Sequence, residues 1–272
     1  MRLVRFLLAL ASVVGCVVAA NADAVALPSA HSHNDYEQKR PLHDALDHGF
    51  ASVEADIHLV DGELLVAHDR IKVQRDRTLE SLYLAPLHQR VTGNKGFVHP
   101  GLARFTLLID IKADPEGTYA ALDPLLRRHR EVLTRFTPDR TFPGAITVIL
   151  SGARPTALVA AQAERFCAID GRPEDLKNGT STNLIPMVSE AWGTAFGRIP
   201  GNPLPEATRT ALNDYVRRAH AQGRVVRFWG APDREWFWNE MQRAGVDYIN
   251  TDRIPDLAAF LKSRTHEAKP AR

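Results

Sequence analysis

Imidazole and carboxylate side chains gather in two short stretches near the start of the sequence. The first stretch is His31-Ser-His-Asn-Asp35, and the second holds Glu54 and Asp56 and continues to His68-Asp69. Each lies in or directly after an apolar, strand-like run. Residues two apart on a strand point to the same face, so we expect Glu54 and Asp56 to lie side by side.

Two carboxylates on one buried face predict a metal site. Inside a barrel, Glu54 and Asp56 would be costly together unless a cation compensated their charge, and a divalent metal is the simplest compensation. His33 and His68 then supply one imidazole from each flanking stretch. These two imidazoles are enough for a general acid and a general base.

A third carboxylate stands near the end of the apolar run Leu107-Leu-Ile-Asp-Ile-Lys112. An acid in such a strand is costly unless it is ligated or paired. Lys112 lies two residues after Asp110 and shares its face. Two interpretations follow: a structural ion pair, or a third metal carboxylate at Asp110 with Lys112 as a phosphate contact.

Polar residues also end two later strand-like runs. Arg227 and Trp229 alternate on the run Val225–Trp229, where Arg227 would be a phosphate contact and Trp229 a pocket wall. Asp252 follows Asn250-Thr251 and either caps the next helix or meets the ligand.

Strand-like apolar runs recur along the chain with helical segments between them, as in a (β/α)₈ TIM barrel. We expect one domain over residues 25–264 and a frayed tail over 265–272. The predicted strands are Ala24–Ala30, Ala51–Leu59, Phe105–Ile111, Ala145–Leu150, Phe166–Ile169, Leu184–Val188, Val225–Trp229 and Val246–Ile249. The predicted helices are Leu42–His48, Leu125–Phe136 starting at Asp123-Pro124, Ala207–Gln222, Arg234–Ala244 capped by Asp233, and one from Pro255 to about Lys262.

Composition and the N-terminal residues indicate which partners and which localisation to expect. The 272 residues are 44% hydrophobic and carry a formal net charge of +2, which does not point to a nucleic-acid partner. Basic Met1–Arg5, an apolar run and Ala22-Asp-Ala24 are typical of a secretory signal peptide over residues 1–24. The sequence therefore predicts export to the periplasm or the extracellular space. A lipid anchor on Cys16 of Val13-Val-Gly-Cys16 is the alternative, so membrane contact is expected only through that anchor or through a substrate.

Taken together, these residues resemble the superfamily of phospholipase-C-like phosphodiesterases, which includes glycerophosphodiester phosphodiesterases and spider-type sphingomyelinase D. The matching pieces are His33, Glu54-Ala-Asp56, His68-Asp69, Asp110-Ile-Lys112 and Gly245-Val-Asp-Tyr-Ile-Asn-Thr-Asp252. The runs His31-Ser-His-Asn-Asp-Tyr36, Pro41-Leu42, Ser52-Val-Glu-Ala-Asp56 and Asp61-Gly-Glu-Leu-Leu-Val66 are closer to the branch named altered inheritance of mitochondria protein 6.

The resemblance implies one divalent cation, Mg²⁺ or Ca²⁺, held by Glu54, Asp56 and Asp110. It also implies two catalytic histidines, and the spacing to Pro41 favours His33 over His31 as the partner of His68. Two positions depart from the pattern of glycerophosphodiesterases. Asn34 replaces an arginine, and Leu42 replaces the glutamate of the Pro-Glu-Asn-Thr motif, which is a metal ligand there.

The sequence thus predicts a metal-dependent phosphoric diester hydrolase acting on a glycerophosphodiester or a phospholipid head group. The predicted substrate contacts are Asn34, Lys112, Arg227, Trp229 and Asp252. One alternative is a multinuclear metal hydrolase of the PHP or amidohydrolase type built on His31-x-His33, although the later strands offer no further histidine. The other is an exported barrel that binds a lipid head group or glycan without turnover.

Overall fold

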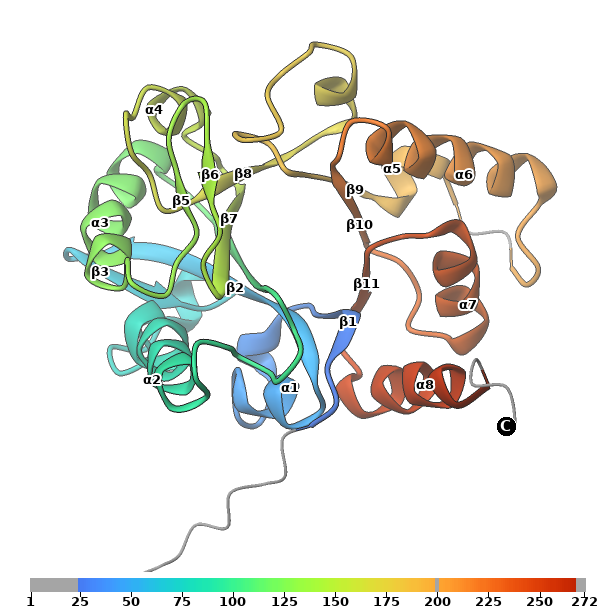
Figure 1. Ribbon diagram of the computed structural model, residues 1–272, viewed down its shortest axis with the longest axis horizontal. Coiled ribbons are helices and arrows are strands. Elements are labelled where there is room, and N and C mark those ends of the chain that lie inside the picture. Colours follow the sequence, from blue (N-terminus) through green and yellow to red (C-terminus); the bar gives the residue numbers. More distant parts are fainter. Residues whose placement is uncertain (1–23, 199–200, 268–272) are drawn as a thin grey trace, which may run out of the picture.

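Eight parallel strands close into a barrel in the computed structural model, which describes residues 24–198 and 201–267. The sheet is closed because β1 pairs with both β11 and β2. Seen down the barrel, the strands form the inner ring and the helices lie outside it (Figure 1). The predicted TIM barrel is confirmed. Its strands are β1 (Leu27–Ser32), β2 (Phe50–Val60), β4 (Phe105–Ile111), β7 (Ile146–Gly152), β8 (Ala168–Gly171), β9 (Met187–Ala191), β10 (Val225–Trp229) and β11 (Tyr248–Thr251).

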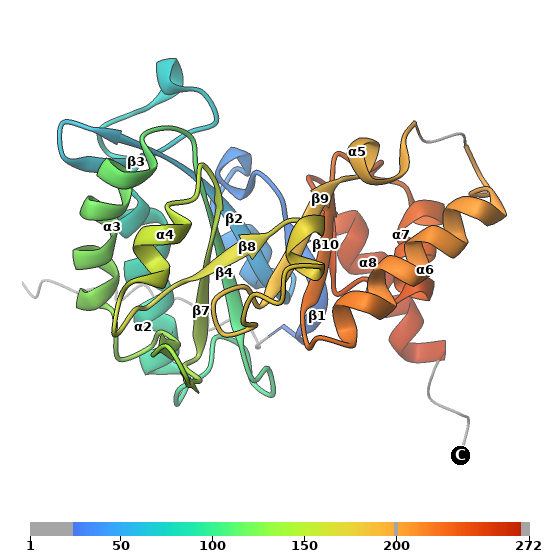
Figure 2. The same cartoon turned by 90° about the horizontal axis from the view of Figure 1, so that it is seen from above.

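Helices and two small antiparallel elements surround this barrel. Strand β3 (Glu63–Val66) extends β2 as a hairpin, and β5 (Arg135–Phe136) pairs with β6 (Thr141–Phe142). Figure 2 shows helices on both sides of the strands. They are α1 (His43–Asp47), α2 (Ala85–Gly93), α3 (Pro115–Arg128), α4 (Thr156–Ala160), α5 (Trp192–Phe196), α6 (Glu206–His220), α7 (Glu235–Ala244) and α8 (Ile254–Glu267). No helix in the described part has the length and apolar character that a membrane span requires.

Successive side chains of a strand point alternately outward and inward, and this alternation separates two apolar clusters. Outward residues such as Val53, Leu107 and Val148 pack in the large core between the barrel and its helices. Inward residues form a smaller cluster made by Leu108, Ile149 and Met187. The same alternation brings the polar residues inside, because the register aligns Asp56 with Asp110 and Asp110 with Ser151.

The helix predicted over Leu125–Phe136 is wrong in position. Helix α3 begins ten residues earlier, at Pro115, and the Asp114 side chain caps it by accepting from the Gly117 N–H at 3.1 Å. Pro124 lies inside the helix, so the Asp123-Pro124 pair does not start it. Two Asp-Pro pairs compete in this segment, and the earlier one provides the cap.

Other predicted boundaries hold with small shifts. Helix α7 spans Glu235–Ala244, but the Asp233 carboxylate accepts from the Asp252 N–H at 2.9 Å instead of capping it. Helix α8 continues to Glu267, so the start of the predicted tail is helical. The segment 69–104, without a clear sequence period, holds the π-helix Glu80–Leu84 followed by α2. Residues 1–23, which include most of the predicted signal peptide, and residues 268–272 lie outside the described residues.

The loop between β1 and α1 is held by one buried carboxylate. Asp35 accepts hydrogen bonds from the Ser32 hydroxyl at 2.7 Å, the Tyr83 hydroxyl at 3.0 Å and the Leu42 N–H at 2.5 Å. Leu42 has φ 64° and ψ −50°, and the His43 N–H donates to the Pro41 carbonyl, which is a γ-turn. Asp35 thus holds a strained turn in place.

We expect Asp35→Ala to lower the free energy of unfolding by about 2–4 kcal/mol, because it leaves three buried donors without an acceptor. Chemical denaturation at pH 7.5 measures this loss. Asp47→Ala is the matched control, since Asp47 pairs with an exposed Arg40 and such pairs contribute at most about 1 kcal/mol. Equal losses in the two variants would contradict the role of Asp35.

A histidine is buried inside the barrel next to the polar face of β2. His31 Nδ1 lies 2.7 Å from the Ser52 hydroxyl, and only 1% of the residue is exposed. Burial, reinforced by the nearby Arg227 charge, lowers the pKa of His31 to about 4. The imidazole is therefore neutral in the native barrel at neutral pH.

This buried imidazole predicts a loss of stability in acid. The unfolded chain takes up the proton near pH 6.5 and the native chain only near pH 4, so stability falls as the pH drops through that range. The full effect is about 3 kcal/mol. Burial raises the pKa of Asp35 and of Asp110 to about 6, which acts in the opposite direction. The difference in unfolding free energy between the wild type and His31→Gln, followed from pH 7.5 to 4, isolates His31. Parallel curves would refute the assignment.

Candidate functional site

A pocket of about 310 Å³ opens at the carboxyl ends of the barrel strands. Residues from both predicted stretches and from later strands line it together: His33, Asn34, Glu54, Asp56, His68, Asp110, Lys112, Ser151, Gly152, Arg172, Arg227 and Trp229. Of the ten predicted site residues, nine line this pocket. The tenth, Asp252, contacts His33 from β11's end.

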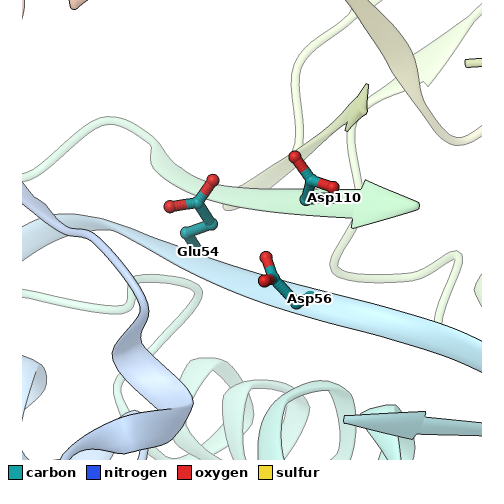
Figure 3. A group of neighbouring side chains, drawn as sticks. All are labelled: Glu54, Asp56 and Asp110. Atoms are coloured by element: carbon teal, nitrogen blue, oxygen red, sulfur yellow. The ribbon is translucent and has the colours of Figure 1, made fainter. Parts of the chain in front are cut away.

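Three carboxylates converge in the pocket. One oxygen each from Glu54, Asp56 and Asp110 lies within 4.8 Å of the others. Glu54 and Asp56 project from β2 and Asp110 projects from β4 to the same side of the sheet (Figure 3). Burial raises the pKa of Asp110 to about 6, and the neighbouring Asp56 and Glu54 charges act in the same direction against Lys112. Such a cluster of oxygen donors suits a hard divalent cation.

Lys112 spans two of these carboxylates. Its Nζ lies 2.7 Å from Asp56 Oδ2 and 3.3 Å from Asp110 Oδ1. The ion pair with Asp110 that the sequence allowed is therefore present. It does not exclude a metal role, because Asp110 remains part of the three-carboxylate cluster.

Arg227 balances the charge of Glu54. Its Nη2 donates to Glu54 Oε2 at 3.1 Å and its Nε donates to Asn250 Oδ1 at 2.8 Å. Burial alone would raise the pKa of Glu54, but the guanidinium and the two imidazoles outweigh it and hold that pKa well below its usual range. The structure thus gives Arg227 a carboxylate partner, and its predicted phosphate contact stays a prediction.

His33 is oriented by Asp252. Nδ1 of the imidazole lies 2.8 Å from Asp252 Oδ1, and Nε2 lies 3.6 Å from Glu54 Oε2. Burial lowers the pKa of His33, but the hydrogen bond to Asp252 and the Glu54 charge outweigh it, so the pKa is raised overall. Asp252, predicted as a substrate contact or a helix cap, is here the partner of a histidine.

His68 also lines the pocket and shares Asp56 with a tyrosine. Its Nδ1 lies 3.0 Å from Asp56 Oδ2, which leaves Nε2 as the ring nitrogen for a substrate. The Tyr36 hydroxyl lies 2.6 Å from the same oxygen and 2.7 Å from Asn34 Oδ1. Burial and the Asp56 charge raise the pKa of Tyr36 well above its usual range, so it remains a neutral donor.

Sequence reasoning assigned no role to Tyr36, Asp170 or Arg172. Tyr36 lies only two residues after Asn34, in the quoted motif. Asp170 ends the run Phe166-Cys-Ala-Ile-Asp170, which repeats the pattern that singled out Asp110. An acid at the end of an apolar strand was therefore an available signal, and it leads directly to Arg172, the pocket cation that Asp170 binds.

Fungal proteins are similar to this chain over most of its length. The altered inheritance of mitochondria protein 6 homolog of Arthroderma benhamiae is 31% identical over 256 residues, which cover 82% of this chain and 81% of the relative. Altered inheritance of mitochondria protein 6 of Eremothecium gossypii is 29% identical, with 88% and 70% covered. The prediction of an exported, periplasmic or extracellular protein is wrong, because these relatives are fungal proteins whose name refers to mitochondria.

A solved glycerophosphodiester phosphodiesterase from Parabacteroides distasonis shares the fold. It has a TM-score of 0.52 and 15% sequence identity, with 89% of this chain and 99% of that chain covered. Residues 225–254 match the family model described as "Glycerophosphoryl diester phosphodiesterase family". The description "AIM6-like phosphodiesterase domain" matches residues 20–170, more than half of the chain. The chain therefore belongs to the AIM6-like phosphodiesterase family.

Proposed function

We propose that this protein is a metal-dependent phosphodiester hydrolase that acts on a glycerophosphodiester or a phospholipid head group. The observation that carries the proposal is the meeting of three carboxylates with two imidazoles and an ammonium in one pocket. Membership of a phosphodiesterase family supports the reaction class.

The residues fit a resident cation of the Mg²⁺ or Ca²⁺ type. All three candidate ligands, Glu54, Asp56 and Asp110, offer oxygen atoms, which are the donors that both ions prefer. The raised pKa of Asp110 shows that burial and the neighbouring anions oppose a full set of charges without a counter-ion. When bound, such a cation supplies a positive charge that polarises a phosphoryl oxygen.

The histidines supply the proton transfers. Asp252 fixes the His33 ring through Nδ1, and Asp56 fixes the His68 ring through Nδ1. Nε2 is then the nitrogen of each ring that would meet the reacting groups, and in His33 it also lies 3.6 Å from Glu54 Oε2. One histidine acts as base or nucleophile, and the other protonates the leaving alcohol. Lys112, beside Asp56 and Asp110, adds a positive charge next to the phosphate.

The multinuclear alternative finds less support in the geometry. His31 Nδ1 contacts Ser52, and its Nε2 lies 4.0 Å from Glu54 Oε2. The candidate metal-binding group among the described residues contains carboxylates and no histidine. One bound cation per chain, measured by elemental analysis, would agree with the proposal, and two or more would favour the alternative.

We expect Asp110→Asn to lower kcat/KM at least about 10²-fold, since several kcal/mol of transition-state stabilisation depend on a bound cation. The far-UV circular dichroism and the cooperative melt should remain. Mg²⁺ or Ca²⁺ should raise the melting temperature of the wild type and not that of the variant. Full activity in Asp110→Asn would leave Asp110 as a structural partner of Lys112 only.

We expect His33→Ala and His68→Ala each to lose about 10²–10⁴-fold in kcat, the usual effect of removing a general acid or base. The double variant should be little worse than either single variant, because the two act as a unit. His31→Ala should lose much less. Steady-state kinetics on purified protein, with and without chelator, provide the comparison. A loss in His31→Ala equal to that in His33→Ala, together with a lost metal ion, would instead support the His31-x-His33 metal centre.

A further inference from the structure

Arg172 is a pocket residue whose position is set by a network of buried polar groups. It directly follows β8, and its side chain lines the pocket. The fully buried Asp170 carboxylate accepts from Arg172 Nη1 at 2.8 Å, from the Ser151 hydroxyl at 2.8 Å and from the Ser189 hydroxyl at 2.5 Å. Three strands, β7, β8 and β9, thus contribute to holding one guanidinium.

Most of the hydrogen bonds that hold the guanidinium are made by Nη1. Nη1 donates to Asp170 and to the Gly171 carbonyl at 2.9 Å, with Ser189 at 3.3 Å. Nη2 has a 3.5 Å contact with Ser151, and no acceptor among the described residues contacts Nε. The Nε–Nη2 edge is the fork that binds two oxygens of a carboxylate or phosphate in parallel. It is the edge that the network leaves for a ligand.

The other strong cations of the pocket are already engaged by the carboxylate cluster. Arg227 is paired with Glu54, and Lys112 is paired with Asp56 and Asp110. The partner of Arg172, Asp170, lies outside that cluster. The Trp229 ring lies 5.0 Å from Arg172 Cζ and limits how the guanidinium plane can turn. Arg172 is therefore a positioned cation on the wall shared with Trp229.

We propose that Arg172 binds the non-bridging oxygens of the phosphodiester through its Nε–Nη2 edge. This inference rests on the proposed function, since it assigns a contact for the same substrate. It gives Arg172 the phosphate contact that the sequence suggested for Arg227. Arg172 is not part of either segment that matches a family model, residues 20–170 and residues 225–254.

The test compares Arg172→Met and Arg172→Lys with the wild type on two substrates and one ligand. The substrates are glycerophosphocholine and bis(4-nitrophenyl) phosphate, and the ligand is inorganic phosphate, titrated calorimetrically with Mg²⁺ or Ca²⁺ present. Arg172→Lys keeps a charge beside Asp170 and so protects the fold. Arg154→Met is the matched control, because Arg154 donates to the Asp170 carbonyl and does not line the pocket.

We expect Arg172→Met to lower kcat/KM by about 10²–10³-fold on both substrates alike, the usual effect of losing one transition-state donor. Phosphate affinity should fall at least tenfold. Arg172→Lys should recover little, because an ammonium lacks the fork. Arg154→Met should stay within about threefold of the wild type.

Each other outcome has a definite meaning. A loss confined to glycerophosphocholine would overturn the proposal and place Arg172 on the leaving group. Unchanged turnover and phosphate affinity in both variants would overturn it and leave only a structural pair with Asp170. If the wild type hydrolyses neither substrate while Arg172→Met loses phosphate affinity, the phosphate contact stands and the proposed hydrolase function fails.

Discussion

Repulsion among three carboxylates inside one barrel is the constraint on which the site depends. One oxygen of each of Glu54, Asp56 and Asp110 lies within 4.8 Å of the others. The alternation of side chains points all three into the barrel, and the register aligns Asp56 with Asp110. Like charges at this distance in a partly buried site are strongly unfavourable. The surrounding groups therefore act as compensation. Arg227 neutralises Glu54, and Lys112 stands between Asp56 and Asp110.

Buried hydrogen bonds hold the β1–α1 loop, which carries His33 and Asn34 to the carboxylates. His33 and Asn34 have to enter the pocket beside Glu54, and Asn34 lies in the left-handed region with φ 46°. The backbone N–H of Asn34 points to Glu54 Oε2 at 3.4 Å. Asp35, fully buried, fixes the other end of the loop through Ser32, Tyr83 and Leu42. Strained backbone of this kind persists only where the surroundings determine it, as Asp35 does here.

Strand periodicity made the barrel and most of the pocket predictable from the sequence. Glu54 and Asp56 are two residues apart in an apolar run, so they were expected to face inward together. An acid in the run of residues 107–112 singled out Asp110, and the family resemblance joined it to the other two carboxylates. Local sequence signals did not predict the start of α3, because two equivalent Asp-Pro pairs occur in that segment. They also failed where a partner lies far along the chain. The pairing of Arg227 with Glu54 spans 173 residues, and that of His33 with Asp252 spans 219. No local pattern specifies such contacts.

The resemblance to glycerophosphodiesterases places Leu42 where those enzymes have a glutamate, and this difference would change the charge that the pocket offers to a substrate. Leu42 is fully buried, and its side chain has no donor atom that could serve as a ligand. If the proposed divalent ion is bound, its two charges and those of the two paired cations would exceed the three carboxylates by one positive charge, while Arg172 and Asp170 cancel each other. A phosphodiester carries one negative charge and would bring the pocket to neutrality. A fourth carboxylate would already bring the sum to zero before substrate binds. On the proposed function, the leucine would therefore favour a singly charged diester, which Arg172 would hold beside Trp229.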